Sequence, residues 1–172
     1  QMHAFKAINL FFLGALIGVE LFLGIFVAKI VFYAPVSLAD GGVVDMFARG
    51  MLMSAIFQAL GYVMVAICAL NLLYELVALR DSANFKQKIS KIFLAVINLA
   101  LSLLFLLYYT SEILQVQNEI VQGAKSIEAL ASEEFRAFHA QSERLVKVLV
   151  IAQMLLFFLN FVSKKCVTQN KE

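Results

Sequence analysis

The sequence has few of the residues from which soluble active sites are built. Among 172 residues there are two cysteines, two histidines, one proline and no tryptophan, and only 15% of the residues are charged. Soluble domains carry about 25% charged and about 45–50% apolar residues. Here 62% of the residues are hydrophobic and the mean hydropathy is +0.87. This composition excludes a soluble domain, and a net charge of +2 gives no reason to expect nucleic acid as a partner.

Motifs of the common enzyme classes are also missing. Cys68 lies in a long apolar stretch and Cys166 near the end of the chain, so the closely spaced cysteine pair of a thiol–disulfide membrane enzyme is not present. The sequence has no phosphate-binding glycine loop, nucleophile elbow or zincin pattern. We therefore expect that the protein is not an enzyme, and we interpret Cys68 as a small core residue.

Four long apolar stretches cover most of the chain, at about residues 7–34, 50–79, 92–110 and 145–163. Each is long enough to cross a bilayer core, which needs about 20 residues of helix. The first is too long for the apolar core of a signal peptide, about 7–15 residues, so we expect it to be retained. The sequence predicts an all-α, polytopic membrane four-helix bundle that forms a single domain over residues 1–172.

Basic residues gather in three regions that four spans would place on one side of the membrane: the N-terminal end, the connection between the second and third spans, and the tail. They are Lys6, Arg80, Lys86, Lys88, Lys91, Lys164, Lys165 and Lys171. Basic residues next to spans favour the cytoplasmic side. We predict a multi-pass protein of the cell membrane, of the bacterial inner-membrane type, with both termini in the cytoplasm.

The connection 111–144 is acidic, with six glutamates against three basic residues, and belongs on the outer side. Ile113, Val116 and Ile120 share one helical face, which predicts that the third helix continues to a cap near Gly123. Ser132, followed by two glutamates, is typical of a helix start. We expect the last two helices to extend as an extracytoplasmic antiparallel hairpin in which Phe135 and Phe138 face these aliphatic residues.

Glu20 is the most informative polar residue, because a charge at its depth in the first span costs about 2.5–3.5 kcal/mol on insertion scales. Gln58 and Gln153 lie at similar depths, so these three residues form a candidate intramembrane polar site. Two hypotheses stay open. Glu20 is either a carboxylate that handles a proton or a cation, or a neutral glutamic acid that hydrogen-bonds a neighbouring helix for structural reasons.

Other polar residues within the spans favour structural interpretations. Each helix carries one asparagine that we expect to form interhelical hydrogen bonds. These are Asn9, Asn71, Asn98 and Asn160. Lys29 and Glu75 lie near span ends, and we expect both to extend to the membrane interface.

His139 precedes the fourth span and forms, with Ser142 and Glu143, a candidate outer-face site. Its imidazole suits a switch, a metal ligand or a proton relay. No carboxylate–histidine cluster with metal spacing surrounds it. A structural histidine and a metal ligand both stay open, and the sequence identifies neither a metal nor a cofactor.

Three features stand in a recognisable order. They are the stretch 18–32 in the first span, a loop leading into Phe47, and the motif Phe135-x-x-Phe138-His139-x-x-Ser142. In this order they resemble the transmembrane protein 205-like family of four-helix membrane proteins, in which His139 and Ser142 match a histidine and a serine. That family is distantly similar to the membrane domain of copper resistance protein D, which implies a link to metal handling. Where the family often has a further polar residue early in the last span, this chain has Val146 and Lys147.

We compare three classes of function. We expect a non-enzymatic membrane protein that acts as a small transport, metal-tolerance or membrane-scaffold component. The alternative is a proton-coupled exporter of cationic compounds that uses Glu20. A membrane enzyme or haem-bearing subunit lacks nucleophiles and ligands in this sequence. The expected partners are the lipid bilayer, a second copy in a homo-oligomer, and a small cation or metal ion.

The topology is tested by labelling. With a single cysteine at Ser126 in a cysteine-free background, an impermeant maleimide should label intact cells, because the acidic connection is predicted to lie outside. Labelling only after permeabilisation would reverse the assignment.

Overall fold

The structure, a computed structural model, describes residues 2–33, 45–79 and 85–162. All regular secondary structure in these ranges is helical. In chain order the elements are α1 (Met2–Phe22), η1 (Leu23–Val27), α2 (Ala28–Tyr33), α3 (Met46–Ala78), α4 (Phe85–Leu104), η3 (Phe105–Thr110), α5 (Ser111–Val121), η4 (Ile127–Ala131) and α6 (Glu133–Val162). Several predicted positions, namely Arg80, Lys164, Lys165, Cys166 and Lys171, lie outside the described residues.

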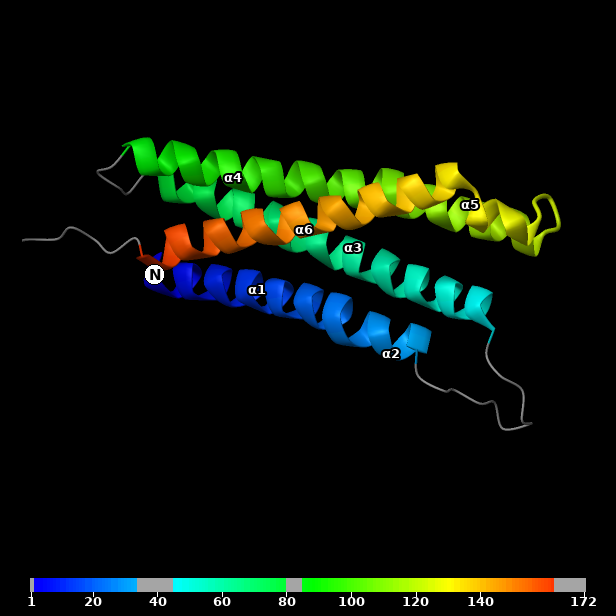
Figure 1. Cartoon of the computed structure of the whole chain (residues 1–172). Helices are drawn as coiled ribbons and strands as arrows, with labels where there is room; N and C mark the ends of the chain where they lie inside the picture. Colours follow the sequence, from blue (N-terminus) through cyan, green and yellow to red (C-terminus); the bar gives the residue numbers. More distant parts are fainter. Residues whose placement is uncertain (1, 34–44, 80–84, 163–172) are drawn as a thin grey trace, which may run out of the picture.

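Four of the helical segments are long and apolar enough to cross a membrane. They are Ala4–Tyr33, Met46–Ala78, Lys86–Val121 and Glu133–Val162. They lie side by side as a bundle, in which α1 and α4 each pack between α3 and α6 (Figure 1). The predicted all-α membrane bundle is confirmed. The helices extend beyond the apolar stretches because polar turns continue them, most clearly at the start of α6.

The first described helix begins, and the last one ends, at the same end of the bundle. Figure 1 shows the start of α1 and the end of α6 at one end of the bundle, which we call the terminal end. The end of α2, the start of α3 and the turn after α5 lie at the opposite end, which we call the hairpin end. This agrees with termini on one side of the membrane; the assignment of that side to the cytoplasm stays a prediction.

Two continuous helical rods, α1–α2 and α4–α5, each contain a π-helical segment. Segment η1 lies in the first rod and η3 in the second. A π-segment accommodates one extra residue per turn and leaves the backbone less well bonded than an α-helix does. At the start of α5 the Ser111 hydroxyl donates back to the carbonyl of Leu106 in η3 at 3.4 Å. Both segments lie toward the hairpin end, and η1 begins three residues after Glu20.

Two clusters of buried apolar side chains fill the bundle. We call the first the hairpin-side core; it contains Leu16, Leu60, Met64, Cys68, Phe105 and Leu149. We call the second the terminal-side core; it contains Leu13, Ala95 and Leu156. The interpretation of Cys68 as a core residue is confirmed by its full burial.

The hairpin turn has the expected caps. Gly123 adopts a positive φ of 74°, which favours glycine, and ends α5. The Phe135 amide donates to the Ser132 hydroxyl at 3.2 Å, which starts α6. The short 3₁₀-helix η4 between these caps has no counterpart in the sequence prediction.

The aromatic contact in the hairpin differs from the expected one. The Phe138 ring packs on Tyr108 and Tyr109, with ring centroids 5.5 and 4.9 Å apart, instead of the predicted Ile113, Val116 and Ile120. The helix α5 packs on α3 at the same end. Hydrophobic periodicity identified the inward face of α5 but gave no information about which helix covers it.

Gly61 allows α3 to pack closely against η3, the π-helical segment between α4 and α5. A Cβ added there would lie 2.8 Å from Leu106 Cδ1, whereas one added at Gly18 would meet nothing within 4 Å. Each Gly→Ala change gains about 1 kcal/mol of helix propensity. Gly61→Ala also overpacks the interface, so we expect it to be less stable than Gly18→Ala by about 1–3 kcal/mol. Unfolding titrations in a denaturing detergent measure this difference, and equal stabilities would contradict the close approach.

Candidate functional site

Buried polar side chains alternate with the two apolar cores along the bundle. Near the terminal end the Asn71 amide donates to Asn9 Oδ1 at 2.9 Å and joins α3 to α1. One turn further along α3, Glu75 Oε1 accepts a hydrogen bond of 2.5 Å from Asn160 on α6. These four residues form the terminal polar layer, and all of them are buried. Three of the four asparagines predicted to join helices therefore do so.

The position of Glu75 corrects a prediction. It was expected to reach the interface, but it is only 5% exposed and faces the bundle interior. Distance from a span end indicates depth but not direction, and here Glu75 lies on the α3 face that points to the centre of the bundle, where Asn160 of α6 reaches it. Lys6 and Lys91 are the cations nearest to this carboxyl. Lys29, by contrast, is exposed, as expected.

The middle polar layer is centred on Glu20 and Gln153. Gln153 Nε2 donates to Glu20 Oε1 at 3.0 Å, a contact between residues 133 positions apart that joins α1 to α6. Glu20 is 4% exposed and Gln153 is fully buried. Two of the three residues predicted for the intramembrane site thus meet. The third, Gln58, is half-buried on α3, and within the described residues no hydrogen bond joins it to either partner.

Helix α4 contributes two buried polar residues, Asn98 and Ser102, which lie one turn apart. The Ser102 hydroxyl donates to the Asn98 backbone carbonyl at 2.6 Å and lies 3.3 Å from the Cys68 sulfur. Both residues are fully buried. The Asn98 side chain has no hydrogen-bond partner among the described residues at either its oxygen or its nitrogen. The sequence identified Asn98 only as a helix-joining residue.

Glu20 and Gln153 are themselves only partly satisfied. Within the described residues Glu20 Oε2 and Gln153 Oε1 have no hydrogen-bond partner. Buried polar atoms are paired in the great majority of native structures, so unpaired ones point to strain, to function or to a bound species. In the middle polar layer these two atoms come from α1 and α6.

The outer-face residues do not converge in the same way. His139 Nε2 lies 3.6 Å from Glu143 Oε1, and both side chains are more than half exposed. The imidazole stacks on the Phe135 ring, and the two residues line a shallow pocket with Glu143. Ser142 is buried and lies on the bundle side of α6. The structure thus pairs His139 with Glu143 and separates both from Ser142.

The described residues contain no group of three or more histidine, cysteine, aspartate or glutamate side chains able to hold a metal ion. His139 and Glu143 together provide two ligands, whereas protein zinc sites use three or four. Binding of a transition metal at His139 by one copy of the chain is therefore not supported by the arrangement of these residues.

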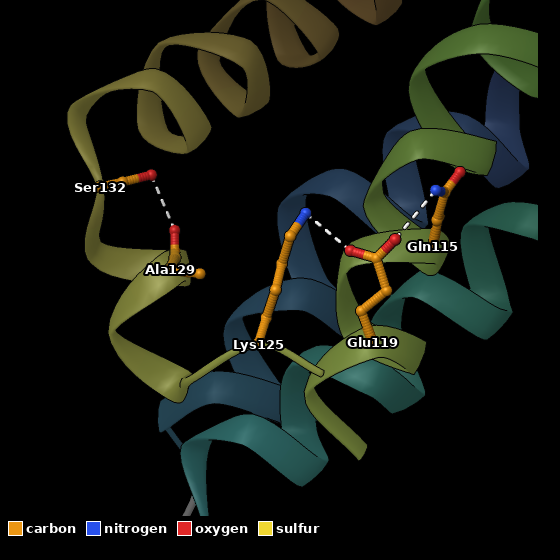
Figure 2. A network of polar contacts seen from close by, with 5 residues as sticks. All are labelled: Gln115, Glu119, Lys125, Ala129 and Ser132. Carbon is orange, nitrogen blue, oxygen red and sulfur yellow. Dashed lines mark hydrogen bonds and ion pairs between the residues drawn. The ribbon is translucent and has the colours of Figure 1, made fainter. Parts of the chain in front are cut away.

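Polar contacts stabilise the hairpin turn next to this pocket (Figure 2). Lys125 pairs with Glu119 at 2.6 Å, and Gln115 donates to the other Glu119 oxygen at 3.0 Å. The Ser126 hydroxyl lowers the pKa of Glu128 below its ordinary value by hydrogen bonding to its carboxylate. The tip of the hairpin therefore keeps its negative charge in neutral solution.

Arg49 was not singled out from the sequence. It is buried near the start of α3, and its guanidinium donates to the carbonyls of Val31 and Phe32 at 3.1 and 3.2 Å. A cation at a helix C-terminus satisfies carbonyls that have no partner within the helix. The sequence signal was an arginine at the edge of an apolar stretch, in a region where lysine and arginine are otherwise sparse.

The four apolar rods and their buried polar layers define a multi-pass membrane four-helix protein. The chain belongs to the family defined by a domain of unknown function, DUF4149, which matches residues 11–122. The match includes Glu20 and Asn98 but ends before Gln153 and His139. No curated protein and no solved structure matches the chain.

The hydrogen bond from Gln153 is expected to hold Glu20 in the interior. Gln153→Leu removes the donor and leaves a buried carboxyl with no partner, which should lower the free energy of unfolding by about 1–3 kcal/mol. Adding Glu20→Leu should restore most of that loss, because both polar groups are then gone. Met154→Leu, the neighbouring lipid-facing change, is the control. A Gln153→Leu protein as stable as the control would show that the bond contributes nothing.

Proposed function

We propose that this chain is a non-enzymatic membrane transport component that moves a small cation, with Glu20 as the group that neutralises it. The observation that carries the proposal is the burial of this carboxyl between α1 and α6 with a neutral amide as its bonded partner. Exchange of the cation for a proton, which the sequence suggested, stays a prediction.

The energetics support a cation at this position. An ionised carboxyl inside the membrane is costly, and residues of this kind in natural proteins line ion or substrate pathways. Within the described residues no lysine or arginine forms an ion pair with Glu20. A cation bound to Glu20 Oε2 would balance the charge of the carboxylate and give this oxygen the partner that it lacks among the described residues.

Two other roles were expected from the sequence, metal tolerance and membrane scaffolding. The resemblance to the transmembrane protein 205-like family supports metal handling, but the residues that carry it, His139 and Ser142, point to different surroundings. A scaffold would use a buried carboxyl to join helices, as Glu75 does, whereas Glu20 Oε2 has no hydrogen-bond partner among the described residues. The middle polar layer therefore favours transport over both.

Uptake into proteoliposomes tests the proposal. Purified protein is reconstituted, and uptake of Na⁺, Rb⁺ and tetraphenylphosphonium down imposed gradients is measured separately. The unmodified protein should accumulate at least one of them faster than protein-free liposomes. Glu20→Gln preserves side-chain shape and removes the charge, so its uptake should fall to the protein-free level.

The matched control is Gln58→Ala, which changes a half-buried amide outside the Glu20–Gln153 pair and should keep full uptake. Circular dichroism and gel filtration check that all variants fold. Equal uptake by Glu20→Gln and the unmodified protein, or no uptake of any of the three cations by the unmodified protein, would refute the proposal.

A further inference from the structure

The carboxyls of Glu20 and Glu75 are held in the same way by one face of α6. Gln153 of α6 donates to Glu20 of α1 at 3.0 Å. Asn160 of α6 donates to Glu75 of α3. The two amides are seven positions apart, so they lie on the same face of α6, about 10.5 Å apart along its axis. Both are at most 2% exposed, and this interior face therefore carries two buried carboxyls from two different helices.

The terminal-side core separates the two carboxyls. Its residue Leu156 lies between Gln153 and Asn160 on α6 and has no exposed surface. An ion bound at one carboxyl is therefore not shared with the other. The contacts define two separate carboxyl–amide pairs along the length of the bundle.

Glu75 lies close to the end of the bundle. It is three residues from the end of α3 at Ala78, and Asn160 is two residues from Val162, the last residue of α6. Lys91 is half-buried nearby, and its charge acts on the Glu75 carboxyl, although within the described residues the two groups form no ion pair. An ion can thus move between Glu75 and the water at the terminal end without crossing an apolar core.

The hydrogen bond from Asn160 does not by itself explain an ionisable group at position 75. A glutamine would accept the same bond without the cost of a carboxylate within the membrane. Asn71 lies one turn before Glu75 on the same face of α3, and its Oδ1 has no partner among the described residues. Asn9, which accepts a bond from Asn71, likewise has an unpaired Nδ2. Unpaired buried atoms of this kind point to function or to a bound species.

We propose that Glu75 is a second binding station for the transported cation, placed between Glu20 and the water at the terminal end. The inference rests on the proposed function, because it extends the path of the same cation. Carboxylate oxygens are ligands that hard cations prefer. When the station is empty, the Lys91 ammonium can balance the charge of Glu75, so it competes with the transported cation and favours its release.

Cation-dependent stability tests the station without transport, in a Glu20→Gln background that removes the first carboxyl. Unfolding temperatures of purified protein in detergent are measured in choline chloride, with increasing NaCl, RbCl or tetraphenylphosphonium chloride at constant ionic strength. The Glu20→Gln protein should still be stabilised, in a saturable way, by at least one of the three cations. Adding Glu75→Gln, which keeps an acceptor for Asn160, should abolish this stabilisation. Adding Glu112→Gln instead, which removes an exposed carboxyl, is the charge-matched control and should preserve it.

Equal responses of the Glu20→Gln protein and the Glu20→Gln/Glu75→Gln protein to all three cations would overturn the station, because Glu75 would then only join helices. If the double variant does not fold, Lys91→Gln is added to Glu20→Gln in its place. Without the competing ammonium, half-maximal stabilisation should move to a lower cation concentration. An unchanged concentration would overturn the station as well.

Uptake into proteoliposomes separates failure of the station from failure of the proposed function. Glu75→Gln in the otherwise unmodified protein should lower uptake to the protein-free level. Full uptake by Glu75→Gln, together with none by Glu20→Gln, would show that the station is wrong and that the transport proposal stands. Full uptake by Glu20→Gln would refute the transport proposal, and the stability titration would still decide whether Glu75 binds a cation.

Discussion

The hydrogen bond between Gln153 and Glu20 is the constraint on which the interior of this bundle depends. Lipid offers no alternative partner to a carboxyl, so Glu20 must face the interior, and this fixes the rotation of α1. The same contact fixes the height of α6 against α1, because it joins the first rod to the last. Apolar side chains alone would fix neither, since lipid and protein interiors are similarly apolar.

The terminal polar layer adds specificity of register to this contact. The Asn71–Asn9 pair joins α3 to α1, and the Asn160–Glu75 pair joins α6 to α3. A shift of α3 by a turn would separate both pairs and leave their amides buried without these partners. Apolar cores between the layers tolerate small adjustments, so the polar pairs, rather than the leucines, select one arrangement of the four helices.

The sequence predicted the helices well because span length and charge asymmetry are one-dimensional properties. It also predicted the caps at Gly123 and Ser132, where local backbone chemistry decides the structure. It failed for Glu75 and for the partners of Phe138, because the facing of a helix in a membrane depends on its neighbours. When a span is apolar on every side, its hydrophobic periodicity does not show which face contacts the other helices. Asn98 was undervalued for the same reason: its type suggested an interhelical hydrogen bond, and only three-dimensional packing shows that its side chain has none among the described residues.

The layered interior also constrains how an ion could reach Glu20. The terminal-side core lies between Glu20 and the terminal end with Leu13 and Leu156, both at most 1% exposed, and the hairpin-side core includes Leu16, one turn from Glu20 on the same helix. A static bundle of this kind is sealed, so transport through it requires the helices to move. The π-segments η1 and η3 lie on the hairpin side of Glu20, in the rods formed by α1–α2 and α4–α5. Their backbone is bonded less regularly than that of an α-helix, and π-segments recur at functional sites.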